Sequence, residues 1–172
     1  SSDISAYGKE TNRIMRDESQ FIGIDNNRLL HVREVGKLCY ELASRLFYWD
    51  ESKCRQMFVM GFLHDVGYEF AEEQTEHEKI GGELMFATGY QHAEPIRLHG
   101  DPNVSLSDDR LLLLNIADMT VNGEGERVGF DKRLEGIGFR YGKDSEQYEA
   151  ASAVIRKIRS ELKRREIREL PL

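Results

Sequence analysis

The residues best suited to do chemistry in this sequence are histidines and aspartates on the apolar faces of expected helices. His31 shares a face with apolar side chains spaced three and four residues apart, and His77 and Asp118 are placed in the same way on two other segments. His64 and Asp65 are adjacent at the end of a further apolar segment. A carboxylate that faces a protein interior is costly unless it is paired or bound to a metal. We therefore expect these side chains to serve a common site.

Imidazole and carboxylate side chains together indicate a divalent-metal centre. They are the ligands that suit zinc, iron, manganese and nickel, and carboxylates extend the choice to magnesium. One inward histidine is more often a core residue with a satisfied hydrogen bond than a ligand. Four inward histidines and two inward aspartates instead favour metal binding. The candidate ligands are His31, His64, Asp65, His77, His99 and Asp118.

Helical periodicity describes the segments that must position these residues. Apolar side chains recur at three- and four-residue spacing, and no alternating strand pattern of useful length appears. The segment Thr75 to Glu78 has the form of a capping box, which predicts a further helix starting near Glu76. The other expected helices cover residues 26–48, 52–65, 93–99, 107–119, 131–142 and 145–168. The sequence therefore predicts an all-α fold, with one domain over 1–172, a core over about 26–122 and the C-terminal helices 131–168 packed on it.

Composition limits the class of protein. At 172 residues, with 40% apolar and 32% charged residues, the chain is typical of one soluble globular domain. A net charge of −7 disfavours an extended nucleic-acid surface, but not a phosphorylated small molecule, because bound cations would offset the acidity. No apolar run is long enough to span a membrane, and the polar first residues predict no secretory signal. Cys39 and Cys54 form no CxxC pattern, which argues against a disulfide scaffold and a thiolate zinc site and favours a cytoplasmic location.

The order of the candidate ligands resembles that of the HD superfamily of metal-dependent phosphohydrolases. The matching strings are R-L-L-H-V-R-E-V-G-K-L at 28–38, G-F-L-H-D-V-G at 61–67 and N-I-A-D-M at 115–119. The resemblance covers about residues 26–122 and implies a compact HD-domain helical bundle. It also implies a metal centre formed by His31, His64, Asp65 and Asp118.

A closer resemblance is to the bacterial HD hydrolases that cleave dinucleoside tetraphosphates symmetrically. That family adds one histidine in an H-x-x-x-G string and another in an I-R-x-H string, which match residues 77–81 and 96–99 here. The resemblance implies two ions among iron, manganese, nickel, cobalt, zinc and magnesium, with His77 and His99 as extra ligands and Asp65 as a bridge. The acidic stretch after Asp65 and the segment 119–133 differ from that family. The expected substrate is thus a nucleotide, a dinucleoside polyphosphate or a related phosphate ester.

Roles in catalysis follow from this reading. A metal-activated water would attack phosphorus, and Asp65 would hold or accept its proton. Arg28 lies one helical turn before His31 and is expected either to bind a substrate phosphate or to form a buried salt bridge. Five further cations lie near the same segments, and each is expected to be solvent-exposed rather than phosphate-binding: Lys79, Arg97, Arg127, Lys132 and Arg133. The leaving-group acid and the oligomeric state are left open.

Two other functions compete with hydrolysis. One is oxygenation by a di-iron HD site, and the other is a catalytically silent module that binds a nucleotide or a partner as a sensor. Candidate ligands at all six positions favour an enzyme. The sequence has no H-E-x-x-H string, no G-x-S-x-G elbow and no P-loop, which argues against zincin proteases, α/β-hydrolases and P-loop NTPases.

Three features lie outside the pattern. The glycines at 123, 125 and 129 are interpreted as loop flexibility, and His92 is expected to be an exposed loop histidine. The charge run over 163–169 is expected to be a solvated helix end.

Overall fold

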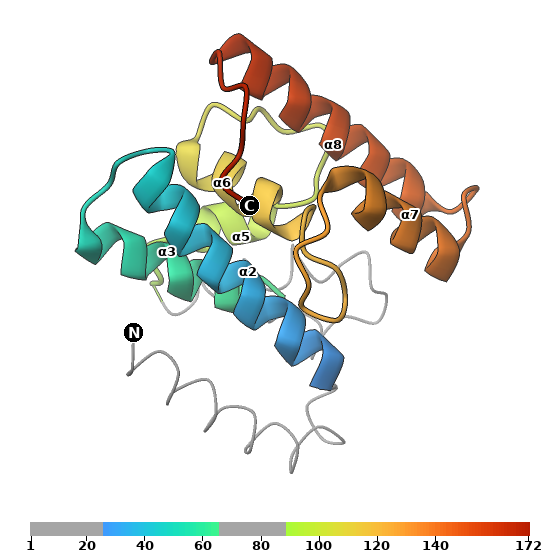
Figure 1. Cartoon of the computed structure of the whole chain (residues 1–172), viewed down its shortest axis with the longest axis horizontal. Helices are drawn as coiled ribbons and strands as arrows, with labels where there is room; N and C mark the ends of the chain where they lie inside the picture. The colour runs from blue at the N-terminus through green and yellow to red at the C-terminus, as the bar shows by residue number, and fades with distance from the viewer. Residues whose placement is uncertain (1–25, 66–88) are drawn as a thin grey trace.

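A computed structural model describes residues 26–65 and 89–172 of the chain, and all structural statements below concern these residues. Six helices occur in them (Figure 1): α2 (Asn26–Arg45), α3 (Glu51–Leu63), α5 (Ala93–Leu98), α6 (Asp109–Asp118), α7 (Phe130–Tyr141) and α8 (Glu146–Arg164). The predicted all-α class is confirmed, since β structure in the described part is limited to one isolated bridge between Val121 and Arg127. No helix in these two ranges combines the length and apolarity needed to cross a bilayer.

Helix ends differ from the predicted ones where a cap decides them. α2 ends at Arg45 instead of residue 48, and the chain turns through Tyr48, whose φ is 56°. Asp50 caps α3 by accepting a hydrogen bond from the Lys53 backbone N–H. Asp108 caps α6, so this helix begins at Asp109 instead of the expected residue 107. The helix expected near Glu76 lies outside the described residues.

The charge run over 163–169 covers the end of α8 and the turn that follows it. The helix stops at Arg164, because Glu166 adopts a left-handed φ of 61° and the Ile167 N–H donates to the Leu162 carbonyl. Arg165 is only 18% exposed and pairs with Asp109 and Glu161. The run therefore comprises the end of α8 and the turn after it, and its charged residues are exposed as expected except Arg165, which anchors the turn to α6.

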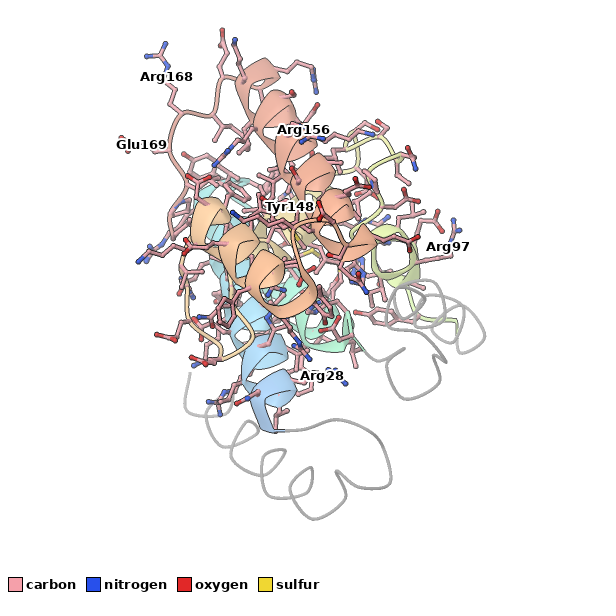
Figure 2. The ribbon with its side chains drawn as sticks, turned by 90° about the vertical axis from the view of Figure 1, so that its right-hand side faces the viewer. Arg28, Arg97, Tyr148, Arg156, Arg168 and Glu169 are labelled. Carbon is pink, nitrogen blue, oxygen red and sulfur yellow. The ribbon has the colours of Figure 1, made fainter. Side chains whose placement is uncertain are left out.

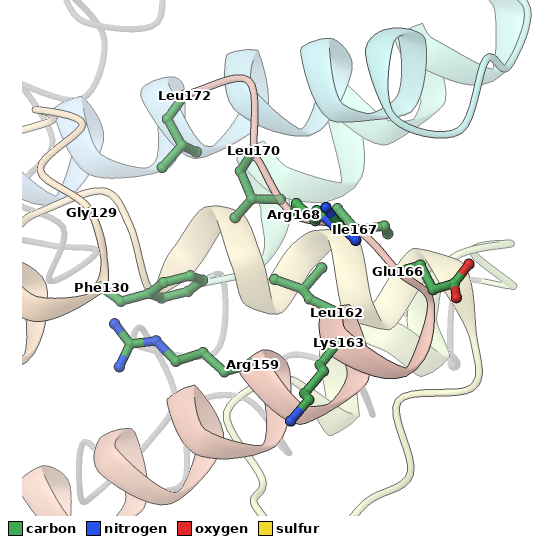
Figure 3. Close-up of a pocket in the computed structure, with 10 residues that line it drawn as sticks. All are labelled: Gly129, Phe130, Arg159, Leu162, Lys163, Glu166, Ile167, Arg168, Leu170 and Leu172. Atoms are coloured by element: carbon green, nitrogen blue, oxygen red, sulfur yellow. The ribbon is translucent and has the colours of Figure 1, made fainter.

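The chain beyond this turn leaves α8 and crosses α6 toward α2 (Figure 1). Figure 3 shows Leu170 and Leu172 of the returning tail near Phe130 and Leu162, and these four side chains line a groove. Ile167 and Leu170 pack against the main hydrophobic core. The C-terminal segment therefore contributes to the folded core.

α6 is the centre of the described fold. It packs against α2, α3, α5 and α8, and the residues from Leu111 to Asp118 are all buried. A helix that is apolar around its whole circumference belongs in the interior. Since α6 ends at Asp118, this arrangement places a carboxylate at the buried end of the central helix.

Two glycines set the close packing of α2 on α3. A Cβ atom at Gly61 would lie 2.9 Å from the Gly36 Cα, and a Cβ atom at Gly36 would lie 2.9 Å from the Phe58 carbonyl oxygen. The two helices run in opposite directions along each other (Figure 1). His31 precedes Gly36 and His64 follows Gly61, so the close crossing brings both imidazoles to the same side.

The loop from Thr120 to Gly129 is tightly bonded, contrary to the flexibility expected from its glycines. The Asn122 backbone N–H donates to the Glu126 carbonyl, and the Val128 N–H donates to the Thr120 carbonyl. Gly125 has a φ of 80°, and a Cβ atom there would lie 2.7 Å from the Leu30 carbonyl oxygen. Glycine at this position therefore allows the loop to lie directly on the first turns of α2.

We predict that Gly36→Ala lowers the free energy of unfolding by about 1–3 kcal/mol, because the methyl group meets backbone and the helices must separate. Gly136→Ala is the matched control: Gly136 also lies inside a helix, α7, but a Cβ atom there meets nothing within 4 Å. That variant should gain about 0.5–1 kcal/mol through helix propensity. Urea denaturation of metal-free protein measures both. Equal effects of the two substitutions would contradict the close crossing.

Candidate metal centre

Five of the six predicted ligands meet in one buried cluster, which we call the His–Asp cluster. It consists of His31 on α2, His64 and Asp65 at the end of α3, His99 at the end of α5, and Asp118 at the end of α6. None of these residues is more than 7% exposed. His77, the sixth predicted ligand, lies outside the described residues.

Asp118 joins two of the imidazoles. Its Oδ1 atom lies 2.9 Å from His31 Nε2 and 3.2 Å from His64 Nε2. These residues are 87 and 54 positions from Asp118 in the sequence. The contact therefore depends on how α2, α3 and α6 pack.

Asp65 is the second carboxylate of the cluster, and it lies close to all three imidazoles. Its Oδ1 atom lies 3.3 Å from His64 Nε2 and 3.9 Å from His99 Nε2, and its Oδ2 atom lies 3.8 Å from His31 Nε2. Ligand atoms of His31, His64 and Asp65 all lie within 4.8 Å of one another, and so do those of His64, His99 and Asp118. Each of these two triplets can hold a metal ion.

All three imidazoles are held through Nδ1 by backbone carbonyl oxygens. His64 bonds to the Gly61 carbonyl and His99 to the Ile96 carbonyl, both at 2.6 Å, and His31 bonds to the Asn122 carbonyl at 3.0 Å. A carbonyl only accepts, so Nδ1 must carry the proton, and in a neutral imidazole Nε2 then presents a lone pair. Metal-ligating histidines in proteins almost always have this arrangement, in which a hydrogen bond from the other ring nitrogen fixes the orientation of the ring and its tautomer.

The donor set thus fits a divalent cation. Three Nε2 atoms and two carboxylates are buried together, and lone pairs facing carboxylate oxygens repel one another unless positive charge lies between them. Protons can supply that charge, and so can a metal. Nitrogen and carboxylate oxygen are the ligand types expected for zinc, iron, manganese, nickel or cobalt.

Electrostatics within the His–Asp cluster are consistent with strong attraction for cations. Burial by itself would lower the pKa of His64, but the charges of Asp65 and Asp118 and the bonds to Asp118 and Gly61 raise that pKa to about 9. Burial would raise the pKa of Asp118, yet His64 and His31 hold it well below its usual range. The metal-free cluster therefore retains a proton on an imidazole that a bound metal would displace.

Cysteine takes no part in the cluster. Cys39 and Cys54 are both unpaired and buried. Burial, and then the nearby charge of Asp118, raise the pKa of the Cys39 thiol well above its ordinary value, so the thiol stays protonated and is a poor ligand. The described groups that could hold a metal contain only histidine and aspartate.

The ends of helices position the ligands. His64 and His99 are the C-cap residues of α3 and α5, and each bonds through Nδ1 to the carbonyl three residues earlier, in the last turn of its helix. The last carbonyls of a helix are available for such bonds. His31 depends instead on Asn122, which sequence reasoning missed. The Asn122 side chain accepts from the Glu124 and Glu126 N–H groups and so shapes the turn that presents its carbonyl. The Asn-Gly pair at 122–123 was the available signal for such a turn.

The predicted cations fall in different places. Arg28 lies half-buried in the first turn of α2, so its role as a phosphate ligand stays a prediction (Figure 2). Arg97 pairs with Glu94 on the outer side of α5 (Figure 2), and Lys132 is exposed as expected. Lys79 lies outside the described residues.

Two of these cations are not solvent-exposed, contrary to prediction. Arg127 pairs with Glu34 and Glu41 of α2 and ties the loop 120–129 to that helix. Arg133 lies against Asp118: its Nε atom donates to the Asp118 carbonyl at 3.1 Å, and its side chain is 19% exposed. Periodicity on a single helix does not reveal partners on another.

The expectation for His92 is wrong. His92 is 4% exposed, and its Nε2 lies 2.8 Å from Gln56 Oε1 while Nδ1 lies 3.1 Å from an Arg110 nitrogen. Burial, followed by the charge of Arg110, lowers its pKa. It is a buried histidine with polar partners of its own, separate from the His–Asp cluster.

The groove beneath the C-terminal tail is also separate from the His–Asp cluster, since none of its lining residues belongs to the cluster.

Comparisons with protein-family models, with curated proteins and with solved structures found no match. The functional argument therefore depends on the chain's own residues.

We predict that His64→Ala/Asp65→Ala reduces transition-metal retention to background, because it removes residues from both possible triplets. His92→Ala is the control, since it removes a buried histidine outside the cluster. It should lower the free energy of unfolding by about 1–3 kcal/mol through its lost hydrogen bonds, while metal content stays unchanged. Elemental analysis after gel filtration and circular dichroism provide the two readouts. A folded double variant that still carries stoichiometric metal would refute the site.

Proposed function

We propose that this chain is a metal-dependent phosphohydrolase of the HD-domain kind. Its substrate would be a nucleotide, a dinucleoside polyphosphate or a related phosphate ester. The observation that supports this most is the convergence of His31, His64, Asp65 and Asp118, with every imidazole anchored at Nδ1 and its Nε2 facing the carboxylates. These are the residues that the resemblance to HD phosphohydrolases picks out in the sequence.

The positions of the side chains indicate which residues would bind the metal ion. His31, His64, Asp65 and Asp118 would hold the ion. When bound, a divalent cation would lower the pKa of a water that it coordinates to roughly 7 and draw charge from the phosphate oxygens. The protein's part is to fix the ligands and exclude bulk water, and the burial of all four residues suits that part.

Asp65 is the residue best placed to handle a proton. Both of its oxygens face imidazole nitrogens, with Oδ1 3.3 Å from His64 Nε2 and Oδ2 3.8 Å from His31 Nε2. A carboxylate with two oxygens in the cluster can bind the ion through one and accept a hydrogen bond from the attacking water through the other. We therefore assign Asp65 both roles.

The proposal also includes a second metal ion beside the first. His99 Nε2 lies 3.9 Å from Asp65 Oδ1, and the same oxygen lies 3.3 Å from His64 Nε2, so Asp65 lies close to both histidines. With His77 as a further ligand, Asp65 would bridge two ions, as the resemblance to the dinucleoside tetraphosphate hydrolases implies. Two ions would share the charge of the phosphoryl group.

Hydrolysis is tested by removing and restoring metal. Chelator-treated protein should lose phosphate release from a panel of nucleotides, dinucleoside polyphosphates and simple phosphate esters. Manganese, cobalt or nickel should restore it, because each suits a site of imidazoles and carboxylates. His92→Ala should respond to chelation and metal addition as the wild type does. A metal-loaded protein that cleaves nothing in the panel would contradict the proposal, and an absorption band from mixed-valent iron would then indicate oxygenation.

Metal counting tests the second ion. His77→Ala and His99→Ala should each reduce the content from two ions to about one, and activity should fall much more than thermal stability, because each removes a ligand of the second ion only. Metal titration followed by elemental analysis gives the count. A wild type that saturates with one ion, which both variants keep, would leave a mononuclear site.

A further inference from the structure

Arg133 is the basic side chain that the described ion pairs bring to the His–Asp cluster. Its Nε atom donates to the Asp118 backbone carbonyl at 3.1 Å, and its Nη2 atom lies 3.9 Å from Asp118 Oδ1. It belongs to the first turns of α7, which begins at Phe130 directly after the loop that carries Asn122. One segment therefore supplies both the carbonyl that orients His31 and a guanidinium beside Asp118.

The guanidinium has hydrogen-bonding capacity left over. Arginine has five N–H donors, and within the described residues Arg133 uses one of them, from Nε, in a hydrogen bond. The distance of 3.9 Å from Nη2 to Asp118 Oδ1 is too long for a second bond. The planar end of the side chain thus retains donors next to the cluster.

Arg133 also lies at the boundary between the cluster and solvent. Its side chain is 19% exposed, whereas that of Asp118 is 10% exposed and that of His64 is fully buried. A ligand that reached Asp118 from solvent would meet the guanidinium beside it. Two other described arginines near this region pair with carboxylates, Arg127 with Glu34 and Glu41 and Arg97 with Glu94.

We propose that Arg133 binds nonbridging oxygens of the substrate's phosphoryl group beside the metal ligands. The inference rests on the proposed phosphohydrolase function and adds a substrate-binding residue to it. A phosphoryl group needs positive charge and several donors, and a guanidinium supplies both in a planar array. The Nε bond to the Asp118 carbonyl fixes the side chain, so that its remaining donors are held beside Asp118 before the substrate arrives.

A purely structural role predicts different behaviour. An arginine that only satisfies the last carbonyl of α6 would, when removed, loosen Asp118 and weaken metal retention. Phosphate affinity would then fall only as far as the metal was lost. Binding of inorganic phosphate to protein with a verified metal content separates the two roles.

The experiment uses isothermal titration calorimetry of metal-loaded full chain with inorganic phosphate as the probe. Arg133→Ala should keep wild-type metal content and weaken phosphate binding at least about tenfold, since a charge-assisted bidentate contact is lost. Arg133→Lys keeps the charge but lacks the planar donors, so it should recover only part of the affinity. Added guanidinium ion should strengthen phosphate binding to Arg133→Ala but not to wild type.

Lys132→Ala is the matched control, because Lys132 is exposed, neighbours Arg133 on α7 and carries the same charge. It should change phosphate affinity less than about twofold if the effect of Arg133 is local and not one of net charge. If wild type hydrolyses its substrate but wild type and both Arg133 variants bind phosphate equally well, the inference is overturned and the proposed function is not. Loss of metal in both Arg133 variants would also overturn it and assign Arg133 to structure. Absence of hydrolysis in metal-loaded wild type would instead refute the proposed function.

Discussion

The hydrogen bonds from three imidazole Nδ1 atoms to backbone carbonyls are the interactions on which the candidate site depends. They hold each ring in one orientation and leave Nε2 as the atom that faces Asp65 and Asp118. A buried histidine without such a partner could turn either nitrogen inward or rotate away. Because main-chain atoms accept these bonds, the ring positions are as well defined as the helices themselves.

Backbone geometry supplies those carbonyls at little extra cost. Two of the histidines end helices, where the last carbonyls are available and an imidazole N–H can donate to one of them. The third, His31, bonds to a glycine-containing turn that lies on α2. Arg127 holds this turn on the helix through ion pairs with Glu34 and Glu41. The close crossing at Gly36 and Gly61 then sets how near α2 and α3 can bring their histidines. The features that terminate, turn and pack the helices are therefore the same features that arrange the ligands.

This arrangement concentrates charge where a stable core would have none. Two carboxylates and three imidazoles are buried against a central helix that is otherwise apolar. Without a metal, the carboxylates are balanced by a proton on His64, whose pKa is raised to about 9. A bound divalent cation would replace that proton, so metal affinity and protonation of the cluster would be linked. Local departures from core-forming rules of this kind are expected at functional sites.

The sequence by itself determined the helical class and most helix positions, because apolar spacing along one segment depends only on that segment. It also identified five residues that the structure brings together, since an inward polar side chain is conspicuous against an apolar face. Tertiary structure alone decided which groups meet them. Asn122 bonds to His31 across 91 residues of sequence and Arg133 reaches Asp118 from another helix, while His92, expected to be exposed, is buried against Gln56 and Arg110. Periodicity within a helix says which face is buried, but not which distant group that face will touch, because the packing of the helices decides that contact.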